Sequence, residues 1–183
     1  MQKIIGIIGR IGAGKDTVAE YIARKYGYAV VAFRDAVKEV TEKEGLELTR
    51  ANMQAVSKKY RDRYGGDYFT NIIMKKVAES GPKIIIKEMR TEGDVLPLKN
   101  MFRKMKIILI EADAEKRFER MFARGRAGDP QTLEEFEGQE KREEELGYTQ
   151  ALQYDDFKIN NNGTLGELYE KVDKLFKTTQ YDE

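Results

Sequence analysis

The sequence predicts an α/β fold in which a five-stranded parallel sheet is covered by helices on both faces. Two observations carry this prediction. Short apolar runs alternate along the chain with amphipathic segments, as strands alternate with crossover helices in parallel sheets. Several runs, such as "KIIIK" and "KIILIE", are apolar throughout, which is typical of strands buried on both faces. The expected strands are residues 3–8, 28–33, 83–87, 106–111 and 157–160.

Helical periodicity and end signals place helices between these strands. Thr49 can cap one helix that Gly65 ends, and Thr164 with Glu167 forms a capping box for the last one. The expected helices are residues 13–26, 35–45, 49–64, 67–80, 91–102, a helix capped by Asp113, 132–146, and one after Thr164. Residues 178–183 are expected to form a frayed tail.

The chain contains no linker or repeat that would divide it, so residues 1–183 are expected to form one domain. Residues 113–152 do not fit the alternation, because they offer two or three helices between the fourth and fifth strands. We therefore expect residues 113–152 to form a group of helices in addition to the crossover helices of the sheet.

Composition excludes several classes of protein. The chain has no cysteine and no histidine, which rules out disulfides, a histidine base and a cysteine nucleophile. Charged residues make up 36% of the chain but the net charge is +1, and this balance argues against a nucleic-acid partner. No apolar stretch approaches the roughly 20 residues that cross a bilayer. We therefore expect a soluble, cytoplasmic protein without a membrane partner.

A phosphate-binding motif follows the first strand. Gly9, four further residues, Gly14 and Lys15 match the Walker A pattern, with a strand before the loop and a helix after it. Backbone N–H groups curled by glycines can surround phosphates, and the positive end of the helix dipole points at the same place. The dinucleotide fingerprint G-x-G-x-x-G is not met. The residues expected to hold the phosphate cofactor are Gly9, Arg10, Ile11, Gly12, Ala13, Gly14, Lys15, Asp16 and Thr17.

Asp16 departs from the usual motif, which has Ser or Thr at this position to bind Mg²⁺. One interpretation is that the Asp16 carboxylate binds the ion, because Mg²⁺ prefers hard oxygen ligands. The other is that Asp16 only caps the helix and stabilises its dipole. We favour the metal-linked interpretation slightly.

The segments "GRIGAGKDTVAE", "FRDAVKE" and "DDFKINNNGTLGELYEKV" resemble small P-loop kinases of nucleotides. The resemblance is nearest to dephospho-CoA kinase-like and adenylate kinase-related (deoxy)nucleoside monophosphate kinase-like proteins. It implies a three-layer P-loop NTPase fold with an acceptor-binding segment at about 35–80 and a helical lid at about 113–150. It also implies ATP and Mg²⁺ as cofactors and transfer of the γ-phosphate to a nucleoside monophosphate. The alternatives are dephospho-CoA as acceptor, or a module that binds or hydrolyses ATP without a small acceptor.

The resemblance assigns the acceptor side to four residues: Asp35, Arg61, Arg63 and Arg90. Asp35 follows the second strand, where an acidic residue meets the acceptor, although it could equally cap its helix. Arg90 follows the third strand, at the edge where ligands bind in open α/β sheets. Chance placement of Arg90 remains an alternative.

The resemblance also assigns a lid and an adenine-contacting loop. Phosphoryl transfer needs cations around the γ-phosphate, and arginines on a movable flap would supply them while excluding water. The arginines given this role are Arg120, Arg124, Arg126 and Arg142, and the alternative is a solvated helix face paired with the acidic helix. Asn162 lies in "NNNGT", which resembles the loop at the donor adenine but is also a plain strand-to-helix turn.

One departure affects the metal. The third strand of such kinases normally ends with an aspartate that steadies the water shell of Mg²⁺, but here Lys87 has this position and Glu88 follows it. Either Glu88 serves instead, or Asp16 has taken over the ion, or catalysis is lost or altered. Asp16 and Glu88 are therefore the candidate metal ligands.

Overall fold

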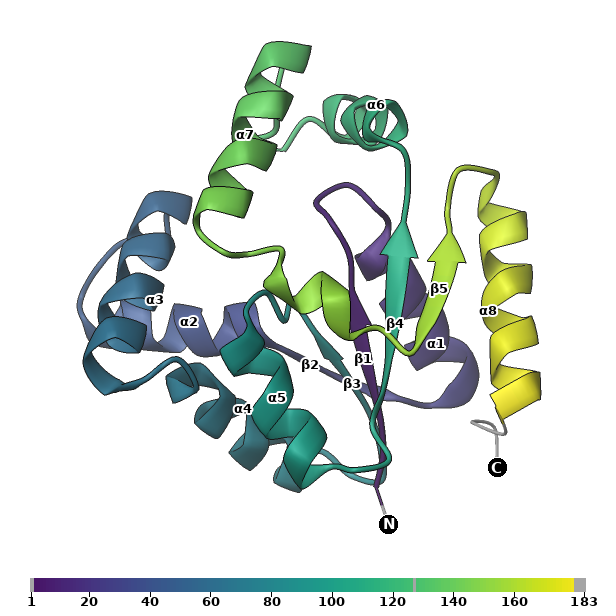
Figure 1. Cartoon of the computed structure of the whole chain (residues 1–183), viewed down its shortest axis with the longest axis horizontal. Coiled ribbons are helices and arrows are strands. Elements are labelled where there is room, and N and C mark those ends of the chain that lie inside the picture. Colours follow the sequence, from purple (N-terminus) through teal and green to yellow (C-terminus); the bar gives the residue numbers. More distant parts are fainter. Residues whose placement is uncertain (1, 127, 180–183) are drawn as a thin grey trace.

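The protein is described here by a computed structural model that covers residues 2–126 and 128–179. Its centre is a sheet whose five strands are all parallel, in the order β2-β3-β1-β4-β5 (Figure 1). The strands are β1 (Lys3–Ile8), β2 (Ala29–Ala32), β3 (Lys83–Lys87), β4 (Lys106–Glu111) and β5 (Phe157–Asn160). The predicted five-stranded parallel sheet is therefore confirmed.

Helices cover both faces of the sheet and its carboxyl edge (Figure 1). Helices α1 (Lys15–Tyr26) and α8 (Leu165–Thr179) pack on one face. The other face carries α2 (Phe33–Lys43), α3 (Arg50–Tyr64), α4 (Tyr68–Glu79), α5 (Glu92–Met101) and the 3-10 helix η1 (Gln150–Tyr154). Above the carboxyl edge lie α6 (Ala114–Arg124) and α7 (Leu133–Glu145), which are called the lid helices below after the role predicted for them.

The central strand shows why its sequence is apolar throughout. Successive side chains of a strand point to opposite faces. Ile5 and Ile7 are fully buried in the apolar cluster beneath α1 and α8, whereas Ile4 and Ile8 are buried in the cluster beneath α2, α4 and α5. Both faces of β1 are thus covered, and the strand ends directly in the glycine-rich loop.

Three local expectations differ from the structure. β2 ends at Ala32 and α2 begins at Phe33, so Asp35 lies in the first helical turn and is not the N-cap. The reason is that Ala32 is still extended while Phe33 is already helical, which starts the helix two residues early. Asp113 precedes α6 but its side chain makes no capping hydrogen bond. Thr178 and Thr179 belong to α8, while residues 180–183 of the expected tail lie outside the described residues.

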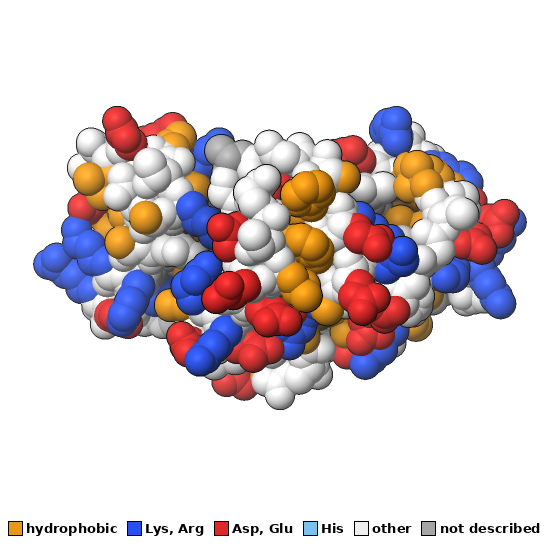
Figure 2. All heavy atoms as spheres, turned by 90° about the horizontal axis from the view of Figure 1, so that it is seen from above, with side chains coloured by type: hydrophobic (Ala, Val, Ile, Leu, Met, Phe, Trp, Pro, Cys, Tyr) orange, Lys and Arg blue, Asp and Glu red, His pale blue; other side chains and the backbone are white. Residues whose placement is uncertain are grey.

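The surface mixes charges of both signs. Figure 2 shows Lys and Arg side chains interspersed with Asp and Glu over the face that carries the lid helices. Such a surface favours local ion pairs over a long-range field of one sign. Within residues 2–126 and 128–179, every helix is too short or too polar to cross a bilayer.

Candidate phosphoryl-transfer site

The loop between β1 and α1 requires glycine for two separate reasons. Gly9, Gly12 and Gly14 have φ angles of 150°, 77° and 101°, which residues with side chains rarely adopt. A Cβ atom on Gly12 would lie 2.8 Å from the carbonyl oxygen of Arg117, and one on Gly14 would collide with the amide of Asn161. At these three positions the loop has room only for backbone, so a ligand can approach the main chain there without meeting a side chain.

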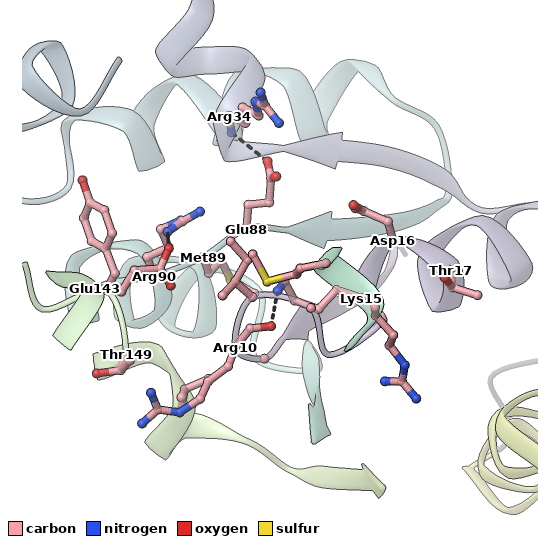
Figure 3. A pocket seen from close by; sticks show the side chains of 18 of the residues that line it. Arg10, Lys15, Asp16, Thr17, Arg34, Glu88, Met89, Arg90, Glu143 and Thr149 are labelled. Carbon is pink, nitrogen blue, oxygen red and sulfur yellow. Dashed lines mark hydrogen bonds and ion pairs between the residues drawn. The ribbon is translucent and has the colours of Figure 1, made fainter. Parts of the chain in front are cut away.

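Lys15, the first residue of α1, is the cation at the end of this loop. Its Nζ donates a hydrogen bond to the carbonyl oxygen of Arg10 at 2.8 Å (Figure 3). Burial lowers the pKa of Lys15 to about 8, and the positive charge of Arg90 acts in the same direction. A partly buried cation whose charge is costly is a site that an anion would stabilise.

Asp16 forms an ion pair with Lys87, with Oδ1 and Nζ 2.6 Å apart. Burial disfavours the charged form of both groups, but the attraction between Asp16 and Lys87 is stronger than this effect. The pKa of Asp16 is therefore below its usual value and the pKa of Lys87 is above its own. The two positions that departed from the motif in the sequence thus meet in the structure.

A cavity of about 380 Å³ opens at the carboxyl edge of the sheet, between the loop, the lid helices and residues that follow β2 and β3. Its lining has seven basic residues and three acidic ones, so it favours an anionic ligand. The basic residues are Arg10, Lys15, Arg34, Arg90, Arg120, Arg124 and Arg126, and the acidic ones are Asp16, Glu88 and Glu143.

Three of the four predicted lid arginines line this cavity. Arg120 donates from Nη2 to the carbonyl oxygen of Asn161 at 2.6 Å, while its buried Nη1 has no hydrogen-bond partner among the described residues. Arg124 forms two hydrogen bonds of 2.7 Å with Asp129, and the backbone N–H of Arg126 donates to the same carboxylate. Arg120, which lines the cavity, therefore holds an unused donor.

Directly after β3, Glu88 has a strained backbone. Its φ is +65°, the one positive φ of a non-glycine residue among those described, and Oε2 accepts from the backbone N–H of Arg34 at 3.2 Å (Figure 3). Strain of this kind is concentrated at functional sites. Arg90 lies between Glu143, at 3.0 Å, and the ring of Tyr148, 4.9 Å from its centroid.

Two acceptor-side arginines predicted from the sequence lie outside the cavity lining. Arg61 pairs with Asp94 at 2.9 Å and donates to the carbonyl oxygen of Gly66 at 2.7 Å. Arg63 lies over the ring of Tyr64, 5.2 Å from its centroid. As the structure stands, both side chains are engaged within the helical layer, and their role toward an acceptor stays a prediction.

Four more predicted residues also lie outside the lining. Asp35 is exposed on the first turn of α2, and Ala13 is buried beneath the loop. Arg142 lies beside a shallower hollow that includes Asp129 and Glu135. Asn162 accepts a hydrogen bond from the backbone N–H of Asp113 at 2.8 Å and so joins two loops.

The contacts that join the lid helices to the phosphate loop could not be predicted from the sequence. Arg117 is buried and binds Glu140 with two hydrogen bonds of 2.5 and 2.7 Å. It also donates to the carbonyl oxygen of Ile11 in the loop at 3.3 Å. From the loop side, Arg10 pairs with Glu144 at 2.7 Å. No local signal distinguishes these residues, because α6 and α7 are rich in charge throughout.

Arg34 and Glu143 were missed as well. Arg34 lies two residues after the end of β2, so the rule that selected Arg90 after β3 would have found it. Glu143 is one of several glutamates in α7, and only the fold shows that it is 7% exposed and binds both Arg50 and Arg90.

The donor groups fit Mg²⁺ only when phosphate oxygens are present. Among the described residues there is no cluster of three or more acidic groups that could hold an ion unaided. Mg²⁺ beside a nucleotide needs just one or two carboxylates, with phosphates and water supplying the other ligands. Asp16 and Glu88 both line the cavity and would meet that need.

The fold and the loop define a P-loop kinase-like protein. Two solved structures share this fold. That of TT1252 from Thermus thermophilus covers 97% of each chain at 22% identity, with a TM-score of 0.65. That of shikimate kinase from Acinetobacter baumannii covers 100% of this chain and 96% of the other at 13% identity, with a TM-score of 0.62.

Sequence comparisons give the family. Residues 8–137 match the AAA domain family, and the chain belongs to it. It also belongs with the UPF0200 proteins: it is 33% identical over 177 residues to that of Thermococcus gammatolerans, covering 94% of this chain and 93% of the relative. A UPF0200/UPF0201 protein of Archaeoglobus fulgidus is 32% identical over 178 residues, but the chain spans only 55% of its length.

Proposed function

We propose that this protein binds ATP and transfers its γ-phosphate to a small phosphorylated acceptor, a nucleoside monophosphate being the first candidate. The observation that carries the proposal is that one cavity brings together the glycine loop, Lys15 and three lid arginines. Phosphoryl transfer needs this combination, because its transition state is stabilised by positioning and by positive charge around the phosphoryl oxygens.

The residues take distinct roles. Backbone N–H groups of the loop and Lys15 hold the outer phosphates of ATP. Arg120 offers its unpartnered Nη1 to the transferring group, and Arg124 and Arg126 add charge from the lid. Mg²⁺ bound with the nucleotide would be held by Asp16 and would neutralise phosphate charge.

Arg34 and Arg90 line the acceptor side of the cavity and are suited to bind the acceptor phosphate. Glu88, fixed by the backbone N–H of Arg34, orients the acceptor. If the acceptor group is a hydroxyl, as in dephospho-CoA, we propose that Glu88 also takes its proton. Shikimate, the ligand of one structural neighbour, belongs in the same test.

A second function is favoured by a specific observation: Lys87, rather than a carboxylate, ends β3 and pairs with Asp16. This arrangement could leave a module that hydrolyses ATP slowly without a small acceptor.

Formation of ADP from ATP separates the two functions when it is measured with nucleoside monophosphates, dephospho-CoA and shikimate in turn. Stimulation by one acceptor supports the kinase, whereas an unchanging slow rate supports the module. The Lys15→Met variant should lose at least about 100-fold in ATP affinity, because the charge-assisted hydrogen bonds to phosphate disappear. Lys25→Met, at the other end of α1, is the control and should bind ATP normally. Retained affinity in Lys15→Met would show that the phosphates lie elsewhere.

A further inference from the structure

Two positions that usually serve Mg²⁺ in P-loop enzymes have changed together in this chain. The residue after the loop lysine usually offers a hydroxyl to the ion, and an aspartate from a neighbouring strand helps to hold it. Here the first position is Asp16 and the second is Lys87. A negative group has replaced a neutral one, and a positive group has replaced a negative one.

The structure joins the two changes in one contact. Nζ of Lys87 lies 2.6 Å from Oδ1 of Asp16, although 71 residues separate them in the chain. Lys87 is the last residue of β3, in register with Ile7 of β1 and Ala32 of β2, so the sheet fixes its backbone from both sides. The Asp16 side chain is half-exposed and lines the cavity, whereas that of Lys87 is 21% exposed.

The ion pair reduces the negative charge that Asp16 offers to a divalent ion. A free carboxylate beside the phosphates would attract Mg²⁺, but a carboxylate that already binds an ammonium group has part of its charge neutralised. Mg²⁺ must then compete with Lys87 for Asp16. Without the ion, the same ammonium group keeps Asp16 from repelling the phosphates of a bound nucleotide.

We propose that Lys87 is an internal counterion of Asp16 that makes nucleotide binding less dependent on Mg²⁺. This inference rests on the proposed nucleotide site. Lys87 here is a specificity-determining residue for the metal, acting through Asp16, and not a catalytic residue. A purely structural ion pair would instead affect folding stability and leave the metal dependence of binding unchanged.

The test is a binding measurement that needs no turnover. The Kd of ADP is measured by calorimetry in excess EDTA and in excess Mg²⁺. The Kd in EDTA divided by the Kd in Mg²⁺ is the metal dependence of binding. Complexation of Mg²⁺ by free ADP is the same for every variant, so it cancels when ratios are compared. In Lys87→Met the ratio should rise about fivefold at low salt, the upper range for a pair at this exposure. High salt should reduce the difference.

Two controls define the result. Lys83→Met removes the same charge from the opposite end of β3 and should leave the ratio at the wild-type value. In an Asp16→Asn background, Lys87→Met should no longer raise the ratio, because the carboxylate for which the two cations compete is gone. Lys87→Gln, which keeps a polar group, is the second variant if Lys87→Met does not fold.

The outcomes are distinguishable. A higher ratio in Lys87→Met that depends on Asp16 supports the inference. ADP binding with equal ratios in the wild type and Lys87→Met overturns this inference alone. If the wild-type protein binds no ADP under either condition, the proposed nucleotide site fails and the inference fails with it.

Discussion

The phosphate loop and the lid both line one cavity but are built in different ways. The loop is shaped by backbone: Gly9, Gly12 and Gly14 adopt conformations that side chains disfavour, and neighbouring atoms leave no room for a Cβ. The lid is attached through side chains: Arg117, which is paired with Glu140 inside the lid, donates to the carbonyl oxygen of Ile11, and Arg10 of the loop pairs with Glu144.

This difference shows how one site can combine rigidity with access. A backbone cradle is organised before the ligand arrives, so binding needs little reordering. Ion pairs between helices can exchange for pairs with phosphate at modest cost, because an arginine that leaves a glutamate can bind a phosphate oxygen instead. The comparison leads to three predictions, ordered by expected size.

Removing the buried side chain of Arg117 should have the largest effect on stability. Arg117→Met leaves Glu140 without its main partner and removes the contact with Ile11, so the free energy of unfolding should fall by about 3 kcal/mol. Urea denaturation measures this change. Arg124→Met breaks a pair whose arginine is more exposed, and Asp129 keeps its hydrogen bond from the backbone N–H of Arg126, so the loss should be smaller, about 1 kcal/mol. Equal losses would mean that the buried contacts of Arg117 contribute no more than the pair of Arg124.

A side chain added at Gly12 of the phosphate loop should have the next largest effect. Gly12 and Gly27 have nearly the same φ, 77° and 73°, but only Gly12 has backbone of another segment within contact distance of its would-be Cβ. Gly27→Ala should therefore show the conformational strain alone, about 1 kcal/mol, and Gly12→Ala about 2 kcal/mol or more. Thermal unfolding with and without ADP compares them, and only Gly12→Ala should also weaken ADP binding. The comparison fails if both variants behave alike.

The smallest effect is a pH dependence that the lid arginines cannot produce, since they stay charged. Lys15 has a pKa of about 8 in the free protein, and bound phosphate favours its charged form. Below about pH 8 the proton is already present. Above it, binding must take up a proton, so ADP affinity should fall by up to about tenfold per pH unit.

The calorimetric Kd of ADP across this range measures the effect. Lys15→Arg keeps its charge and should give a weaker but flat profile. A flat profile in the wild-type protein would mean that Lys15 remains protonated throughout.

Much of the fold was predictable because its signals are local. Strands and helices follow from the spacing of apolar residues within each segment, and Gly9, Gly14 and Lys15 identify the loop within seven residues. The strand order β2-β3-β1-β4-β5 was not predictable in this way, because it depends on which strands pair after the crossovers.

The side chains of the site were predictable only in part. Arg90 and Arg120 line the cavity as expected, but Arg61 binds Asp94, 33 positions later in the sequence. Nothing in the composition of either segment indicates this pair, which forms only when α3 packs beside the start of α5. Long charged side chains can reach several partners, and packing decides among them.

One contact of the phosphate loop can form only after most of the chain has been synthesised. The side-chain amide of Asn161 donates to the carbonyl oxygen of Ala13 at 2.8 Å, across 148 positions of the chain. The motif for phosphate is therefore made early on the ribosome, but its supporting residue emerges only after most of the chain. A nascent chain that ended before β5 would carry the motif without this brace, so phosphate recognition would mature late in translation.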